Sequence, residues 1–99
     1  MAGGSWGDVQ VYNEMISDLG SFNTSVNEAC GVMLNAAQTC LDNMESDKAS
    51  LSASKNLRNS VVKYQEATAT ATALAKELTE ERDALIEYLR SLEEMESEL

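Results

Sequence analysis

The chain has 99 residues, with seven Lys and Arg against seventeen Asp and Glu, and it contains neither His nor Pro. The net charge of −10 argues against binding to nucleic acid or to anionic membrane surfaces, since both attract Lys and Arg. The absence of His removes the most common general base and metal ligand. We therefore expect one folded, non-enzymatic domain over residues 1–99, without catalytic residues, cofactor or metal.

The first residues give no sign of targeting to a membrane. Residues 1–7 have neither a basic segment nor an apolar segment of the kind found in a signal peptide. No run in the chain approaches the roughly 18 apolar residues that cross a bilayer. These features predict a cytoplasmic protein that does not insert into membranes. Export by a route that needs no cleaved signal peptide stays open as an alternative.

A repeat of 3.5 residues runs through residues 8–44 and predicts the first helix. Ser5 and Asp8 are candidate N-cap residues, and we expect Trp6 to fold back onto this helix. The repeat, which we call the seam, consists of apolar or small side chains with one polar member: Val9, Tyr12, Ile16, Leu19, Asn23, Val26, Cys30, Met33, Ala37, Cys40 and Met44. Further apolar positions widen this stripe: Met15, Phe22, Ala29, Ala36 and Leu41.

The same repeat predicts a second helix over residues 48–97, in which Arg82 and Glu96 are the polar exceptions. Its seam is Leu57, Val61, Tyr64, Thr68, Ala71, Ala75, Leu78, Arg82, Leu85, Leu89, Leu92, Glu96 and Leu99. A turn is expected at residues 45–48, because Ser46 and Asp47 are good N-cap residues. One continuous helix is the alternative. A short turn favours an all-α, antiparallel two-helix hairpin of the coiled-coil type.

The second predicted helix is longer than the first, at about 75 Å against about 55 Å. Its far end carries the richest apolar run of the sequence: Leu85, Ile86, Leu89, Leu92 and Met95. The second helix should overshoot the first, so nothing in the hairpin covers this run, which is expected to be an exposed interface for another protein or for a second copy of the chain. We therefore predict that these residues bind a partner in a helical bundle. On this interpretation, Leu89→Lys weakens assembly and leaves the helicity nearly intact.

The two cysteines lie ten residues apart on the first predicted helix, a separation of about 15 Å. A disulfide needs α-carbons within about 7 Å, so Cys30 and Cys40 cannot join each other. Both occupy the seam, where a free thiol packs as a small apolar group. A disulfide between two chains is the alternative. Two thiols without His provide no recognised set of metal ligands.

Charge is distributed unevenly along the chain. Residues 1–47 contain no Lys or Arg, and all seven basic residues lie from Lys48 onward. A helix whose charges are all negative favours a basic partner face. The second helix could supply part of that complement within the chain.

Length, two predicted antiparallel helices, the absence of Pro and the acidic charge together resemble the ESX-type WXG superfamily of type VII secretion, which includes the small helical partners of LXG toxins. The family's Trp-x-Gly lies in the turn, whereas this turn reads Asn43-Met44-Glu45-Ser46-Asp47. Trp6-Gly7 lies at the other end of the helix. The family's Tyr-x-x-x-Asp/Glu signal is missing, because Tyr12, Tyr64 and Tyr88 are followed by Ile16, Thr68 and Leu92.

The resemblance implies a non-enzymatic partner or targeting protein. Such a protein binds a type VII secretion substrate or toxin through an apolar helical stripe. The departures from the family motifs favour an accessory partner over an independently exported substrate, and they allow no site residue to be carried over. The alternative is a self-assembling coiled-coil scaffold without a role in secretion.

Overall fold

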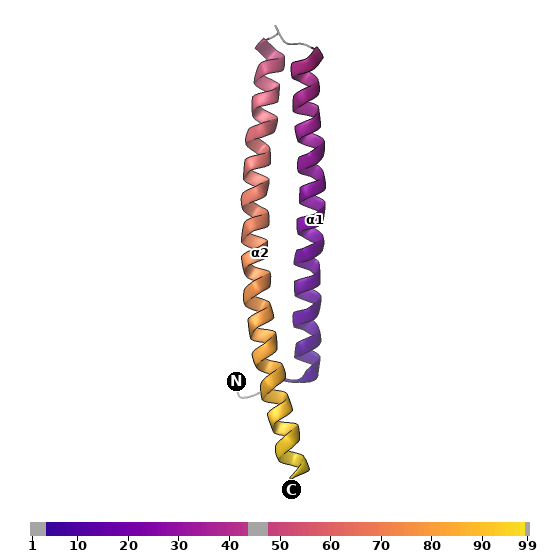
Figure 1. The fold of residues 1–99 in the computed structure, drawn as a ribbon, viewed down its shortest axis with the longest axis vertical. Helices are drawn as coiled ribbons and strands as arrows, with labels where there is room; N and C mark the ends of the chain where they lie inside the picture. The colour runs from indigo at the N-terminus through magenta and orange to yellow at the C-terminus, as the bar shows by residue number, and fades with distance from the viewer. Residues whose placement is uncertain (1–3, 44–47, 99) are drawn as a thin grey trace. The chain divides into compact units, whose positions relative to one another are not determined.

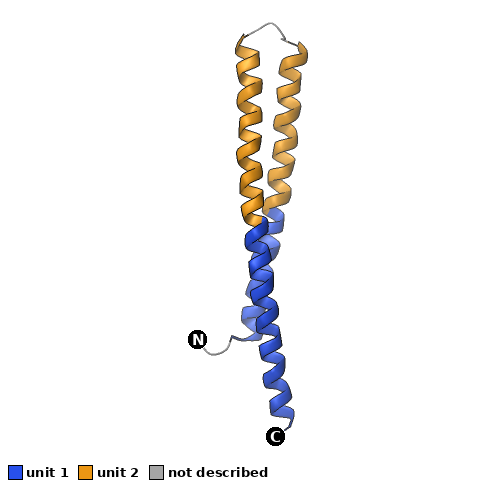
Figure 2. Ribbon diagram, turned by 60° about the vertical axis from the view of Figure 1, so that its left-hand side comes forward, with its two compact units in different colours: residues 1–21, 72–99 blue, residues 22–71 orange. Residues whose placement is uncertain are grey.

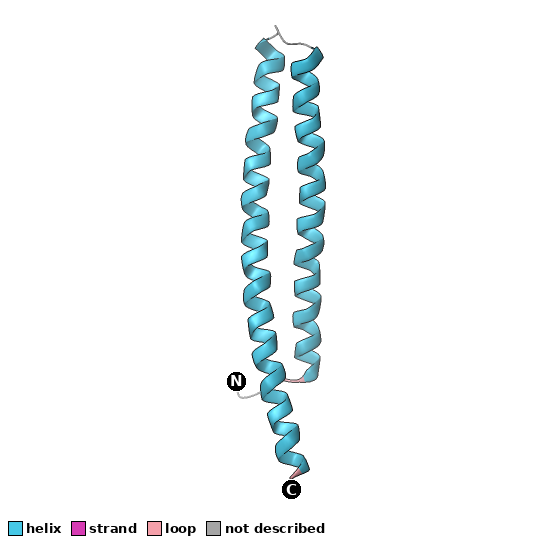
Figure 3. Cartoon of the chain, in the orientation of Figure 1, coloured by secondary structure: helices cyan, strands magenta, loops and turns pink. Residues whose placement is uncertain are grey.

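The computed structural model describes residues 4–43 and 48–98. Two helices occupy almost all of this part of the chain: α1, Trp6–Asn43, and α2, Lys48–Ser97. The described residues contain no strand (Figure 3). The two helices run antiparallel and pack against each other (Figure 1). The predicted all-α helical hairpin is confirmed.

The bounds of α2 agree with the predicted range of 48–97, whereas α1 begins two residues before the predicted start at residue 8. The earlier start follows from a reciprocal cap. The Asp8 backbone N–H donates to Ser5 Oγ at 3.3 Å, and the Ser5 N–H donates to Asp8 Oδ2 at 2.7 Å. Trp6 therefore belongs to the first helical turn. Residues 45–47 of the predicted turn and Met44, the predicted end of the first helix, lie outside the described residues.

The predicted seam is the covered side of α1, where each described member from Val9 to Cys40 is buried or half-buried. In α2 the seam begins earlier than predicted, because Ser50 and Ser54 continue the register and are buried. The pattern of apolar residues could not show this start, since both residues are polar. Leu99, the last predicted member, lies outside the part that the structure describes. Three predicted members of α2 are exposed: Tyr64, Leu92 and Glu96.

The chain divides into two compact units, shown in blue and orange in Figure 2. Unit 1 consists of residues 1–21 and 72–99, and unit 2 of residues 22–71. Each unit contains a stretch of α1 packed against a stretch of α2. The expectation of a single domain over residues 1–99 stays a prediction.

Candidate functional site

The apolar run predicted to bind a partner lies in α2 within unit 1, and its residues differ in exposure. Leu89 is buried, with 7% of its surface exposed, and Leu85 and Ile86 are half-buried. Leu92 and Met95 are exposed, at 38% and 62%. The expectation that the hairpin leaves this whole run uncovered is therefore wrong for Leu89. The expected exposure is correct for Leu92 and Met95.

The start of α1 explains why Leu89 is covered. Trp6 Nε1 donates to Glu93 Oε1 at 2.9 Å, which places the first turn of α1 beside this part of α2. Gly4 lies against the Leu85 side chain, since a Cβ at Gly4 would stand 2.9 Å from Leu85 Cδ1. The predicted overhang of α2 exists (Figure 1), but it begins near Glu93 and not at Leu85. Trp6, expected to fold back onto its own helix, shares a hollow with Val9, Gln10 and Asn13 of α1, and its Nε1 also joins α1 to α2.

A second apolar surface lies beside the seam of unit 1 and forms an open groove of about 840 Å³, which we call the apolar groove. Residues from both helices line it: Gly4, Asp8, Val11, Tyr12, Met15, Leu78, Glu81, Ala84, Leu85 and Tyr88. Val11, Met15 and Tyr88 are large and exposed. Of the residues predicted to bind a partner, Leu85 alone contributes to this groove.

The heptad repeat accounts for the position of the groove. With seam positions labelled a and d, Met15 and Tyr88 occupy g positions, and Val11 and Ala84 occupy c positions. Positions g and c lie on the same flank of a helix, and antiparallel packing sets the g positions of the two helices side by side. Ala84 lies one turn from Glu81 and one from Tyr88, so its small side chain leaves a hollow between them.

A hydrogen bond joins the two helices within the groove. The Tyr12 hydroxyl donates to Glu81 Oε2 at 3.2 Å. This bond raises the pKa of Tyr12 above the ordinary value of 10.0, because only the neutral phenol can donate. Removal from water and the negative charges of Glu81 and Asp8 raise the pKa of Tyr12 further. Tyr12 is therefore neutral at physiological pH and holds the Glu81 carboxylate in place.

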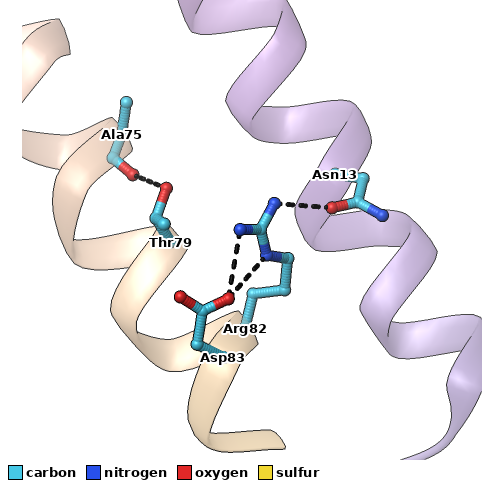
Figure 4. A network of polar contacts seen from close by, with 5 residues as sticks. All are labelled: Asn13, Ala75, Thr79, Arg82 and Asp83. Atoms are coloured by element: carbon cyan, nitrogen blue, oxygen red, sulfur yellow. Dashed lines mark hydrogen bonds and ion pairs between the residues drawn. The ribbon is translucent and has the colours of Figure 1, made fainter. Parts of the chain in front are cut away.

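The other flank of unit 1 carries a network of polar contacts (Figure 4). Arg82 Nη1 donates to Asn13 Oδ1 across the helices at 2.9 Å. Its Nε and Nη2 donate to Asp83 Oδ1 at 3.2 Å and 3.1 Å. On the same stretch of α2, the Thr79 hydroxyl donates to the Ala75 carbonyl oxygen at 2.8 Å. Arg82, a polar exception in the predicted seam, thus extends towards the polar flank.

Among the described residues, no group of three or more His, Cys, Asp or Glu side chains could hold a metal ion. Both cysteines are free, with Cys30 buried and Cys40 half-buried in unit 2. A disulfide between chains stays an untested alternative. Neither helix, over its described residues, is long and apolar enough to cross a bilayer.

Sequence reasoning missed the groove residues Val11, Met15 and Tyr88 as candidate contacts. The signal was present in part, because Met15 widens the apolar stripe beside the seam. Tyr88 gave no such signal on its own. Met15 and Tyr88 lie on different helices, and they form one surface because antiparallel packing places their g positions side by side.

These features combine exposed apolar side chains and two carboxylates on one flank of unit 1 with a polar network on the other. In comparisons with known proteins, no protein-family model, curated protein or solved structure matches this chain. The resemblance to small type VII secretion partners therefore stays a prediction, and the function is argued from the groove.

Proposed function

We propose that this protein is a non-enzymatic helical partner protein that binds helices of another protein. The apolar groove is the observation that carries the proposal. Its exposed side chains Val11, Met15 and Tyr88 gather on one flank of a hairpin that has a small core. Contiguous apolar surface of this kind on a charged chain is typical of a protein-binding site.

The two-helix architecture supports a helical ligand. A groove between two antiparallel helices accepts a third helix, which inserts apolar side chains spaced three and four residues apart. Beyond the groove, Leu92 and Met95 provide further apolar surface near the end of α2. The partner contacts predicted from sequence are kept in this proposal for Leu85, Leu92 and Met95. Leu89 is instead assigned to the core of unit 1, and Ile86 to the edge of its seam.

The identity of the partner is a finer part of the proposal. Following the resemblance to the WXG superfamily, we propose that the ligand is a type VII secretion substrate or toxin. This chain would keep such a ligand soluble or present it for export. This part rests on length, hairpin prediction and acidic charge, and not on the groove itself.

A tagged pull-down from the native organism tests the proposal, with proteins identified in both cell extract and culture medium. We expect one larger helical protein in near-equal amount. Its purified complex should unfold at a higher temperature than the chain alone, because a ligand of the folded state stabilises it. Recovery of the chain alone, as a defined oligomer confined to cells, would contradict the proposal and favour the self-assembling scaffold. Recovery of the complex from the medium tests the secretion role.

A further inference from the structure

The apolar groove carries charges of one sign. Asp8 and Glu81 are its charged lining residues, and both are acidic. On the same flank, the neighbouring c position of α2 holds Glu77, which is exposed. The groove is thus an apolar surface with acidic edges on both helices.

The basic residues of unit 1 do not neutralise these edges. Arg82 points to the polar flank, where it donates to Asn13 and Asp83. Lys76 and Arg90 occupy b positions, which lie on the flank away from g and c. The sequence left open whether α2 supplies positive charges that balance the negative charges of α1. On the groove flank of unit 1, α2 does not supply them.

We propose that the apolar groove binds an amphipathic helix of another protein, in which Lys or Arg residues flank a stripe of apolar residues. This inference rests on the proposed function and names the chemistry of the partner. Apolar side chains of that helix cover Met15 and Tyr88, and its cations face Asp8 and Glu81. Charge complementarity of this kind sets the specificity and the rate of association.

Two further contacts favour a cation beside the groove. The Tyr12 hydroxyl holds the Glu81 carboxylate at 3.2 Å, so an incoming Lys or Arg meets an acceptor that is already positioned. The rings of Tyr12 and Tyr88 line the same surface and offer faces for cation–π contact.

A second copy of this chain is a poor occupant on the same grounds. Each copy carries a net charge of −10, and residues 1–47 contain no Lys or Arg. Pairing two grooves would bring the acidic edges of both copies together, and like charges across an interface oppose association. The charge of the groove therefore selects a basic partner over self-association.

The first experiment measures binding of a defined probe to the full chain by fluorescence anisotropy at about 0.15 M salt. The probe is a synthetic helical peptide with a Leu stripe flanked by Lys. We expect it to bind at least about tenfold more tightly than a scrambled peptide of identical composition and than a peptide with Glu in place of Lys, a difference of about 1.4 kcal/mol or more.

Variants locate the site. Met15→Glu and Tyr88→Glu should each weaken binding of the Lys peptide by at least about tenfold. Val62→Glu is the matched control, because Val62 is an exposed apolar residue of unit 2 and the change in charge is the same. It should alter the affinity by less than about twofold. Glu81→Gln should reduce both the affinity and its dependence on salt. Far-ultraviolet circular dichroism confirms that each variant is folded.

Three outcomes would overturn the inference. The scrambled peptide could bind as tightly as the Lys peptide, which would show attraction by charge alone. Tyr88→Glu could weaken binding no more than Val62→Glu. The chain could form a dimer that Tyr88→Glu dissociates, which would make a second copy the occupant.

The pull-down separates this inference from the proposed function. If wild-type protein and the Tyr88→Glu variant recover the same helical partner equally well, the proposed function stands and the groove assignment is wrong. If the wild-type protein recovers no partner, the proposed function fails, whatever the peptide does.

Discussion

Units 1 and 2 share one heptad register but fill it with side chains of different size. In unit 1 the buried apolar residues are Val9 and Leu89. In unit 2 the covered positions are mostly small, including Ala37, which is fully buried, and Ser54. The flanking g positions differ in the same way, apart from the exposed Phe22 at the start of unit 2: they include Met15, Leu74 and Tyr88 in unit 1, and Ala29, Ala36 and Ala67 in unit 2.

Side-chain size therefore decides what the same repeat produces. Small side chains at the contact allow helix axes to approach closely. In unit 2 Tyr64 is exposed although it occupies a seam position, while its neighbours Ser60 and Ala67 are half-buried. In unit 1 large residues beside the seam stand out from the hairpin and form the groove. We infer close packing of the two helices in unit 2, and the contact with another protein that we propose is assigned to unit 1.

The largest expected effect is at Leu89, because this side chain is buried in the core of unit 1. Leu89→Lys should lower the free energy of unfolding by about 3 kcal/mol or more, because it removes a buried apolar side chain and places a charge at a buried position. Urea unfolding followed by circular dichroism measures this. Met95→Lys, at an exposed site on the same helix, should change stability by less than about 0.5 kcal/mol. A stable Leu89→Lys hairpin would return Leu89 to the partner surface.

Overpacking at Ala37 tests whether unit 2 depends on small residues. Ala37 is fully buried, and Ala37→Leu should lower the free energy of unfolding by about 1–3 kcal/mol. The neighbouring Ala36 is exposed, so Ala36→Leu is a matched control and should be close to neutral. If the two variants are equally stable, the helices of unit 2 are not closely packed.

The two glycines inside α1 allow the same substitution to be made in each unit, with a smaller expected change in stability. Gly20 belongs to unit 1 and Gly31 to unit 2, and a Cβ at either would meet no atom within 4 Å. Each Gly→Ala change should raise the free energy of unfolding by about 1 kcal/mol, because alanine favours the helix. Amide hydrogen exchange shows which unit each change stabilises. A loss of stability would reveal that the glycine has a packing role.

The smallest expected effect concerns pH. The pKa of Tyr12 is raised in the folded chain. Its hydrogen bond to Glu81 therefore contributes fully to the free energy of unfolding at pH values below the ordinary tyrosine pKa of 10.0. The contribution is lost as pH rises through the higher pKa of the folded state, since the unfolded chain then binds fewer protons. Wild-type protein should be more stable than Tyr12→Phe near pH 8, and the difference should shrink towards pH 11. Urea midpoints across this range measure it, and a constant difference would contradict the linkage.

The two helices, their shared register and the sign of their charges could all be predicted from the amino-acid sequence. Every described seam position of α1 follows from its spacing, and the bounds of α2 were predicted at both ends. The seam of α1 and the extent of α2 follow from local periodicity, because the 3.5-residue repeat predicts which side of a helix is covered, whatever that helix packs against.

The alignment of the two helices along their length, and the flanks at which they meet, depend on how the helices pack in three dimensions. A repeat looks the same after every heptad, so it does not specify that Trp6 lies beside Glu93, and Leu89 was assigned to the wrong surface for that reason. The groove depends likewise on Met15 and Tyr88 sharing one flank of unit 1. These two residues lie on different helices, and their distance in space is set by the antiparallel packing rather than by either local pattern.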